Sequence, residues 1–477
     1  MNNRYSHLGA LLALSTALGF GLAPMPTRSQ TVEGREPTLP GLPAKPPLAA
    51  ALGSPQAAAD PALLREVQAR QANVIRTMAT LVNIDSGTGD AIGLAKVGDL
   101  LAQRLRSLGA NVQELAVPPA IGKVVLGTFQ GTGTKNILLM IHYDTVFEPG
   151  EAAKRPFRID GTRAYGPGVA DAKGGIALIL EALDISRQRG FKGYKTLAVL
   201  FNPDEEKSSL GSRNIIKTLA AKQDVVLSYE PPDGEHVIVA TNGLAYIHLN
   251  VIGKASHAGS APDEGRNAAI EVAGQVMQLR LLGAPAKGTT VNWTKLQSGE
   301  RPNIIPDQAS AIADMRMSDM GEIDRVQSDA NRIIQKRFVP DTQVSVSIES
   351  RRPPFSRNPH SDRLAALAHR IYKELGKTIE PVPMGFGTDA GFAYRPGNAK
   401  PVVLEGLGLV GKGLHSPDES ADLTSVAPRL YLTVRLLEVL SAPDAQPAST
   451  LGNAFTMPAH VVPANQKWNE PGRPTPR

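Results

Sequence analysis

The sequence predicts an α/β fold in which a mostly parallel sheet, flanked by helices, is interrupted by an inserted α+β domain. Continuous apolar runs alternate with helical patterns before Leu244, as expected of strands that are buried on both faces. After Leu244 the runs become mixtures of polar and apolar residues, which is typical of strands with one solvated face. A further continuous apolar run at 401–405 predicts that the chain then returns to the first sheet.

Both ends of the chain are expected to lie outside the folded part. An apolar stretch at 8–22 follows Arg4, which is the layout of a secretory signal peptide, so residues 1–23 are predicted to be a signal. Nine prolines in 24–61 and seven in 442–477 predict a linker and a disordered tail. We therefore expect a secreted, periplasmic protein without a membrane anchor; a buried N-terminal helix is the alternative reading of the apolar stretch.

The elements of the larger domain follow one another in chain order, and this domain is expected in two parts, 62–243 and 354–441. Apolar residues spaced by three and four predict helices, and uninterrupted apolar runs predict buried strands. The predicted helices are 62–82, 92–109, 173–189, 208–221 and 424–440, and the predicted strands are 136–141, 196–201, 225–229 and 401–405.

The inserted domain is expected over 244–353. Four amphipathic segments (AYIHLNVIG, TVNWTKL, ASAIADMRM and TQVSVSI) predict strands, and 266–281 and 321–337 predict two helices between them. Four strands and two helices are enough for a small domain with a core of its own.

Composition excludes several kinds of function. The net charge of +6 is spread along the chain without a basic run, and aromatic residues make up only 5%, so no nucleic-acid partner is expected. Cysteine is absent, which excludes disulfides, thiolate metal sites and cysteine nucleophiles. Any metal must therefore be held by His, Asp and Glu.

Residues suited to metal binding follow the predicted buried strands. In open α/β sheets ligands bind at the carboxyl ends of the strands, so these residues are expected to converge on one cleft. They are His142 and Asp144 after the first strand, Asp171 in a turn-rich segment, Glu205 and Glu206 after the second strand, Glu230 after the third, and His415 after 401–405.

The residue types in this set point to a divalent metal. Two histidines with several carboxylates suit zinc or a similar borderline ion. His142 and Asp144 are two residues apart, so on an extended strand they point to the same side and the carboxylate can orient the imidazole. Glu205 and Glu206 are adjacent and cannot both point one way, so one can bind metal while the other faces substrate as a general base.

The motifs that carry these residues resemble a known family. LLMIHYDTV, AYGPGVADAKGG, VLFNPDEEKSSLGSR, LSYEP, GKASHAGSAPDEGRNA, NIIP, GFGTDA and GLHSPDE are similar in order and spacing to the co-catalytic zinc aminoacylase and carboxypeptidase metallopeptidases, and most of all to bacterial glutamate carboxypeptidases of the carboxypeptidase G type. The resemblance covers about residues 68–440. Ala172 departs from the pattern, because many relatives carry a polar or acidic residue there.

The resemblance implies a site with two Zn²⁺ per chain. His142 and Glu230 would belong to one zinc, Glu206 and His415 to the other, and Asp171 would bridge them. Glu205 would be the general base, taking a proton as hydroxide attacks the scissile carbonyl, and Asp144 would orient His142.

Substrate recognition and assembly are also implied by the resemblance. His257 in KASHAG would be a catalytic residue that stabilises the oxyanion, and the inserted domain would form a homodimer that brings it to the partner's site. Residues implied to bind a free carboxylate are Asn303, Arg316, Arg352, Gly387 and Thr388. The expected activity is hydrolysis of the amide bond to a C-terminal amino acid, with glutamate (N-acyl-glutamate or folate-type substrates) favoured. The alternatives are an N-acyl-amino-acid amidohydrolase or dipeptidase of another specificity and, outside the enzymes, a periplasmic solute-binding protein.

Overall fold

A computed structural model of the chain describes residues 59–442. The predicted signal at 1–23, nearly all of the predicted linker and the predicted tail lie outside these residues. Within them, no helix is both long and apolar enough to cross a membrane. The predicted fold class is confirmed, since a mostly parallel sheet with helices is accompanied by a separate antiparallel sheet with two helices.

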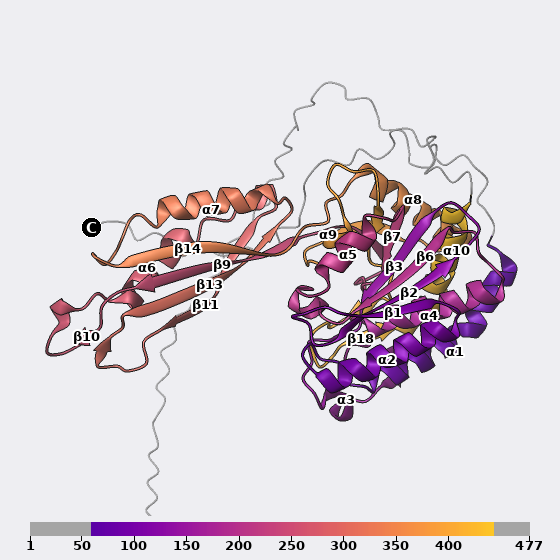
Figure 1. Ribbon diagram of the computed structural model, residues 1–477, viewed down its shortest axis with the longest axis horizontal. Helices are drawn as coiled ribbons and strands as arrows, with labels where there is room; N and C mark the ends of the chain where they lie inside the picture. Colours follow the sequence, from indigo (N-terminus) through magenta and orange to yellow (C-terminus); the bar gives the residue numbers. More distant parts are fainter. Residues whose placement is uncertain (1–58, 443–477) are drawn as a thin grey trace, which may run out of the picture. The chain divides into compact units, whose positions relative to one another are not determined.

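A six-stranded sheet organises the larger domain, in the order β1-β2-β6-β3-β7-β16 (Figure 1). The four strands from β6 to β16 are parallel, while β1 and β2 are antiparallel neighbours at one edge. Sequence analysis found the four parallel strands but not this antiparallel pair. The strands are β1 Asn111–Ala116, β2 Lys123–Gln130, β3 Asn136–His142, β6 Thr196–Asn202, β7 Val225–Ser228 and β16 Val402–Leu404.

Both faces of this sheet are buried, which explains the continuous apolar runs. Along β3, Ile137 and Leu139 belong to one hydrophobic core, whereas Leu138 and Met140 belong to another on the opposite face. The first core is completed by α1 Pro61–Val82, α2 Ala91–Ser107, α4 Lys173–Gln188, α8 Pro359–Glu374 and α10 Val426–Ser441, and the second by α5 Arg213–Ala220 and α9 Ala390–Ala393 (Figure 1).

The predicted helix 208–221 was wrong at its beginning, because α5 begins only at Arg213. Ser208 and Ser209 have φ of 64° and 50°, values that a right-handed helix cannot contain. The buried carboxylate of Asp204 holds this turn by accepting a hydrogen bond from the Gly211 N–H at 2.7 Å. The turn separates the end of β6 from α5 and so leaves Glu205 and Glu206 outside the helix.

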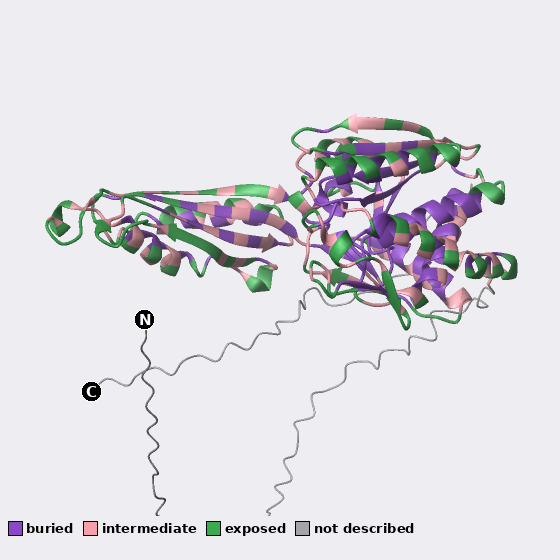
Figure 2. Ribbon diagram, turned by 90° about the horizontal axis from the view of Figure 1, so that it is seen from below, coloured by how far each residue is buried: buried purple, intermediate pink, exposed green. Residues whose placement is uncertain are grey.

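The inserted domain is built on a four-stranded antiparallel sheet in the order β11-β13-β9-β14. Burial alternates along its strands (Figure 2), since one face packs on a core of its own while the other meets solvent. Its elements are β9 Gly243–Ile252, β11 Thr290–Ser298, β13 Gln308–Met317, β14 Gln343–Arg352, α6 Ala268–Leu279 and α7 Gly321–Ile333.

Three smaller sheets, none of them predicted, position loops around the larger sheet and in the inserted domain. One has the order β17-β18-β5-β4 and another pairs β8 with β15 in parallel. The third pairs β10 with β12 inside the inserted domain. Their strands are β4 Arg158–Asp160, β5 Arg163–Tyr165, β8 His236–Thr241, β10 Ser256–His257, β12 Ile304–Ile305, β15 Glu380–Met384, β17 Gly411–Lys412 and β18 Ser420–Asp422.

Candidate metal centre

Acidic and imidazole side chains follow the carboxyl ends of all four parallel strands. His142 is the last residue of β3, and Glu205 opens a short 3-10 turn, η2 (Glu205–Lys207), soon after β6. Glu230 lies two residues beyond the end of β7. Glu405 follows β16 directly. Because parallel strands end at the same edge of the sheet, these side chains are brought into one region.

Asp171 lies between the two histidines. Its Oδ1 is 3.1 Å from Nε2 of His142, and its Oδ2 is 3.1 Å from Nε2 of His415. Each histidine also faces a second carboxylate: His142 Nε2 is 3.5 Å from Glu230 Oε2, and His415 Nε2 is 3.3 Å from Glu206 Oε2. The structure thus brings together all five predicted ligands as two His–Glu pairs that share one aspartate.

The charges of this cluster match divalent cations. Burial, and then repulsion from the Asp171 carboxylate, raise the pKa of Glu206 to about 8. Hydrogen bonds to Asp171 and Glu206 raise the pKa of His415 to about 11. One oxygen of Glu206, Oε1, is buried and has no hydrogen-bond partner among residues 59–442. Cations between these atoms would remove both the carboxylate repulsion and the unpaired oxygen, so the residues fit a metal centre.

Three of the predicted ligands, one from each His–Glu pair and the shared aspartate, lie close enough together to hold a cation. One donor atom from each of His142, Asp171 and Glu206 lies within 4.8 Å of the others. In His142, Nε2 is the nitrogen that can bind a cation. Its Nδ1 lies 3.0 Å from the carbonyl oxygen of Asp144 and therefore carries the hydrogen. Its Nε2 lone pair then points at the carboxylates. Imidazole nitrogen and carboxylate oxygen are donors that zinc accepts.

The Asp144 carboxylate contacts both the imidazole of His142 and the backbone of Glu205 and Glu206. Its Oδ1 is 3.3 Å from Nδ1 of His142, as expected of a residue that orients the ring. Its two oxygens also accept hydrogen bonds from the backbone N–H groups of Glu205, at 3.0 Å, and Glu206, at 3.1 Å. The Thr88 hydroxyl donates a further hydrogen bond at 2.6 Å. A single buried carboxylate thus fixes the ends of two neighbouring strands.

The side chains of Glu205 and Glu206 diverge, as two adjacent residues must. Glu206 faces His415, while the Glu205 carboxylate accepts a hydrogen bond from Nη1 of Arg352. Nη2 of Arg352 donates to the Glu205 carbonyl oxygen at 2.7 Å. Arg352, only 4% exposed, therefore contacts Glu205 in this structure, whereas the sequence predicted contact with a substrate carboxylate.

Gly387 and Thr388 both form hydrogen bonds with buried side chains. The Gly387 carbonyl oxygen accepts a hydrogen bond from Arg352 Nη1 at 3.2 Å, and the Thr388 hydroxyl donates to Glu405 Oε2 at 2.8 Å. The sequence predicted instead that backbone N–H groups at these two residues bind the substrate carboxylate. That role stays a prediction.

The remaining predicted site residues belong to the inserted domain. His257, in β10, and Asn303 lie side by side, because the Ala258 N–H donates to the Asn303 carbonyl oxygen at 3.0 Å. Arg316, on β13, forms a two-pronged ion pair with Asp314 at 2.7 and 2.9 Å. Among residues 59–442, none of the recorded hydrogen bonds of these three side chains reaches the His–Glu pairs.

Two buried carboxylates that the sequence did not single out also border the centre. Glu405 and Glu419 are both 0% exposed and accept hydrogen bonds from the main chain of segments that carry predicted ligands. Glu405 is the last residue of the predicted strand 401–405, and Glu419 is the last residue of the motif GLHSPDE. Their position at a strand end and beside His415 was the available signal.

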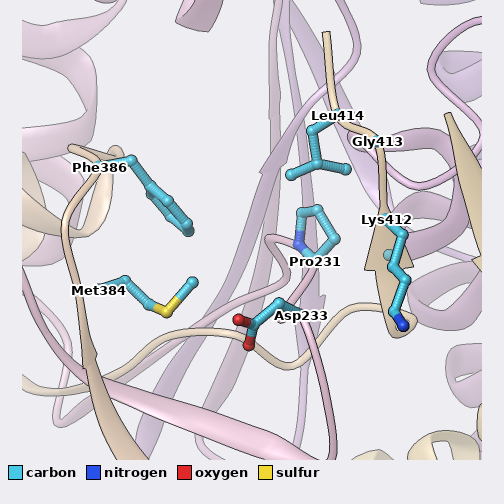
Figure 3. A pocket seen from close by; sticks show the side chains of 8 residues that line it. Pro231, Asp233, Met384, Phe386, Lys412, Gly413 and Leu414 are labelled. Carbon is cyan, nitrogen blue, oxygen red and sulfur yellow. The ribbon is translucent and has the colours of Figure 1, made fainter. Parts of the chain in front are cut away.

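A pocket of about 540 Å³ is lined by residues next in sequence to two predicted ligands. Pro231 follows Glu230 and Leu414 precedes His415. Figure 3 shows Met384 and Phe386 on one side, facing Pro231 and Leu414 across the opening. Asp233 and Lys412 add a charge of each sign. The pocket therefore offers two apolar walls within reach of the metal centre.

Comparison with known proteins agrees with this arrangement. Residues 138–439 match the peptidase family M20/M25/M40. The chain is 40% identical to carboxypeptidase G2 of Pseudomonas sp. (strain RS-16) over 388 residues, which cover 80% of this chain and 93% of that protein.

Solved structures show the same fold. An M20 family metallo-carboxypeptidase from Sulfolobus solfataricus superposes with a TM-score of 0.65 at 16% identity, over 77% of this chain and 99% of that chain. The Bacillus subtilis YXEP protein, described as a dinuclear metal binding peptidase from the M20 family, superposes with a TM-score of 0.56 at 15% identity, over 80% and 99% of the two chains. Together with the sequence match, these findings show that the chain belongs to the M20 family of metallopeptidases and is homologous to carboxypeptidase G2.

Proposed function

We propose that this metallopeptidase is a secreted, zinc-dependent carboxypeptidase that hydrolyses the amide bond to a C-terminal amino acid. The observation that carries the proposal is Asp171, whose two oxygens face two His–Glu pairs while Glu205 lies on the adjoining turn. Homology to carboxypeptidase G2 supports the carboxypeptidase class. Glutamate, in N-acyl or folate-type substrates, is the favoured leaving residue because of the motif resemblance.

His142, Asp171, Glu230, Glu206 and His415 would hold the metal pair. When bound, two divalent cations supply Lewis acidity that activates water and polarises a carbonyl group. Glu205 takes a proton from the attacking water and returns it to the amine that leaves. Arg352 and the hydrogen bonds from the Glu205 and Glu206 backbone to Asp144 hold this glutamate in place.

His257 is suited to stabilise negative charge on the carbonyl oxygen. Its Nδ1 accepts hydrogen bonds from the N–H groups of Gly259 and Ser260, both at 3.1 Å. The hydrogen of the neutral ring must then be on Nε2, which can donate it to an oxyanion. This main-chain control of the tautomer supports a catalytic role for His257.

Two features suit the two ends of the substrate. Arg316 offers a planar fork to a free carboxylate, and in this structure Asp314 already occupies that fork in the same bidentate manner. The pocket beside the centre, with Phe386 and Met384 on one wall, suits the acyl part of the substrate. Asn303 lies next to His257 and, with Arg316, would contact the free carboxylate of the substrate.

We further propose that the chain forms a homodimer through the inserted domain. Ile270 and Met277 on α6, and Leu281 just beyond it, are 58%, 57% and 75% exposed. The spacing of seven residues places Ile270 and Met277 on one face of α6, and Leu281 follows just after the C-cap of the helix. An apolar stripe of this kind on a water-soluble domain is typical of a surface that a partner covers.

A substrate panel tests the proposed activity. Zinc-loaded protein is given N-acyl amino acids that differ only in the C-terminal residue, with the C-terminal amides as controls, and release of the free amino acid is measured. We expect turnover with free carboxylates, highest for glutamate. A preference for another residue would support an amidohydrolase or dipeptidase of different specificity instead. No turnover on any compound by metal-loaded protein would overturn the proposal.

The solute-binding alternative is disfavoured. A binding protein needs no general base, yet Glu205 is held by three groups beside the predicted metal ligands. Membership of a peptidase family also argues against it.

A further inference from the structure

Glu419 joins the two loops that carry Asp171 and His415. Its Oε1 accepts hydrogen bonds from the N–H groups of Ala170, at 2.9 Å, and Asp171, at 3.0 Å, and its Oε2 accepts one from Gly168 at 2.9 Å. It is fully buried. Both oxygens of one carboxylate therefore accept hydrogen bonds from three N–H groups of the same loop.

The strands around Glu419 explain how it reaches this loop. The next residue, Ser420, pairs with Tyr165 at the start of the β18–β5 ladder, and Tyr165 leads directly into the segment from Gly166 to Asp171. His415 lies four residues before Glu419, in the left-handed region with φ of 61°. A His in that conformation costs energy and persists only where its surroundings hold it, so the loop around it must be firmly anchored.

Glu405 has the same relation to Glu230. Its Oε1 accepts hydrogen bonds from the N–H groups of Glu230, at 3.2 Å, and Gly406, at 2.6 Å. Its Oε2 accepts one from the Thr388 hydroxyl at 2.8 Å. Like Glu419, it is 0% exposed and acts on the main chain of a predicted ligand, while its own side chain does not join the His–Glu pairs.

We propose that Glu405 and Glu419 are positioning residues for the metal centre, Glu405 for one ion and Glu419 for both. Glu405 fixes Glu230, which belongs to one His–Glu pair. Glu419 fixes Asp171, which faces both pairs, and the loop of His415. The proposal rests on the ligand set proposed above.

Substitution of Glu419 by glutamine changes the hydrogen bonds of this residue while leaving its packing volume the same. Glutamine keeps the volume but has one acceptor oxygen and an NH₂ group, and in Glu419→Gln the NH₂ group would face a backbone N–H in either orientation of the amide. In Glu419→Gln at least one of the three loop hydrogen bonds is lost, so Asp171 is held less firmly. Loss of a residue that orients metal ligands typically weakens metal binding by about 10- to 100-fold.

The matched control is Glu271→Gln in the inserted domain. Glu271 is also 0% exposed and accepts backbone hydrogen bonds, from Phe338 at 2.8 Å and Val339 at 2.6 Å, but far along the chain from any predicted ligand. Its substitution should lower stability to a similar degree. It should leave metal binding unchanged.

The experiment measures binding of Zn²⁺ alone to metal-free full-length chains by competition with a chromophoric chelator, and metal content by elemental analysis. We expect two ions for the natural chain and for Glu271→Gln. Glu419→Gln should weaken both binding steps by about tenfold or more, and Glu405→Leu, which leaves no acceptor oxygen for the Glu230 N–H, should weaken only one of them. His415→Ala provides the reference for the loss of one step.

Two results would overturn the proposal. One is natural affinity for both ions in folded Glu419→Gln, and the other is an equal loss of affinity in Glu271→Gln. If Glu419→Gln does not fold, Glu419→Asp keeps the charge with a shorter reach and must show the same weakening of both steps. Because the readout is metal binding, failure of the substrate panel would not be mistaken for failure of this proposal.

Discussion

Asp144 shows how much one side chain contributes to the geometry of the centre. It orients His142 and also accepts hydrogen bonds from the N–H groups of Glu205 and Glu206. Glu405 and Glu419 act on the backbone in the same way at the other two ligand segments. Each ligand carboxylate thus has its peptide group held by a second, buried carboxylate, so the ligands can be rigid before any cation arrives.

Replacing Glu205 by glutamine should separate catalysis from metal binding. Glutamine cannot accept a proton, so turnover should fall by about 10²- to 10⁴-fold. Glu205 is not among the five predicted ligands, so the metal content by elemental analysis should stay the same. A Glu205→Gln protein that loses metal together with activity would show that this residue is a ligand and not the base.

Arg316→Lys should weaken recognition of a free carboxylate. Lysine keeps the charge but not the planar fork, so KM should rise about tenfold, equal to about 1.4 kcal/mol. The control is Arg332→Lys, which alters another Arg–Asp pair of the inserted domain, with Arg332 Nη2 2.9 Å from Asp329 Oδ1. Its KM should equal that of the unsubstituted protein. Equal effects of Arg316→Lys on a substrate and on its amide would reject the role.

The candidate metal ligands could be predicted from the sequence, whereas the residues that hold those ligands in position could not. His142, Asp171, Glu206, Glu230 and His415 are of types that are scarce at buried strand ends, and they stood in recognisable motifs. Glu405 and Glu419 accept hydrogen bonds from backbone N–H groups, which every residue except proline has, so no partner residue type marks their role. The contact of Arg352 with Glu205 was missed because it joins segments 147 residues apart.

At the scale of elements, burial on both faces is what made strands predictable. β3, β6, β7 and β16 are apolar along all but their end residues because both cores meet them. β1 is partly exposed, and β4, β5, β17 and β18 have three residues or fewer, so their sequences contain no periodic pattern to find. The late beginning of α5 reflects the Asp204 turn, a tertiary contact that overrides helical spacing.

Helix α6 gives a test of assembly. Met277→Glu with Leu281→Glu places charges on the exposed apolar stripe and should shift the protein from dimer to monomer, measured by light scattering after size exclusion. Ile92→Glu is the matched control, because Ile92 on α2 is 70% exposed but lies in the larger domain. A dimer that persists in the double variant would mean that another surface forms the interface.

At the scale of the whole molecule, catalysis is proposed to need residues from both domains. The metal ligands and Glu205 come from the larger domain, whereas His257, Asn303 and Arg316 come from the inserted one. The inserted domain has a separate hydrophobic core. A substitution on its surface can therefore change activity without loosening the metal centre.

Complementation tests whether His257 serves the partner's site. His257→Ala and Glu205→Ala proteins, each inactive, are mixed under conditions that exchange subunits. If His257 acts across the dimer, random exchange puts about half of the subunits into mixed dimers with one intact site of two, so about a quarter of natural activity should return. If mass labelling proves that subunits exchange but no activity returns, His257 acts in the site of its own chain or has no role in catalysis.

The order of the segments along the chain has a consequence for biosynthesis. His142, Asp171, Glu206 and Glu230 precede the inserted domain, while strand β16 and His415 follow it. During translation the edge of β7 that β16 later covers stays unpaired until the inserted domain has been made. An open, apolar strand edge invites pairing with other chains. Chains cut short within the inserted domain should therefore aggregate, even though they contain four of the five ligands.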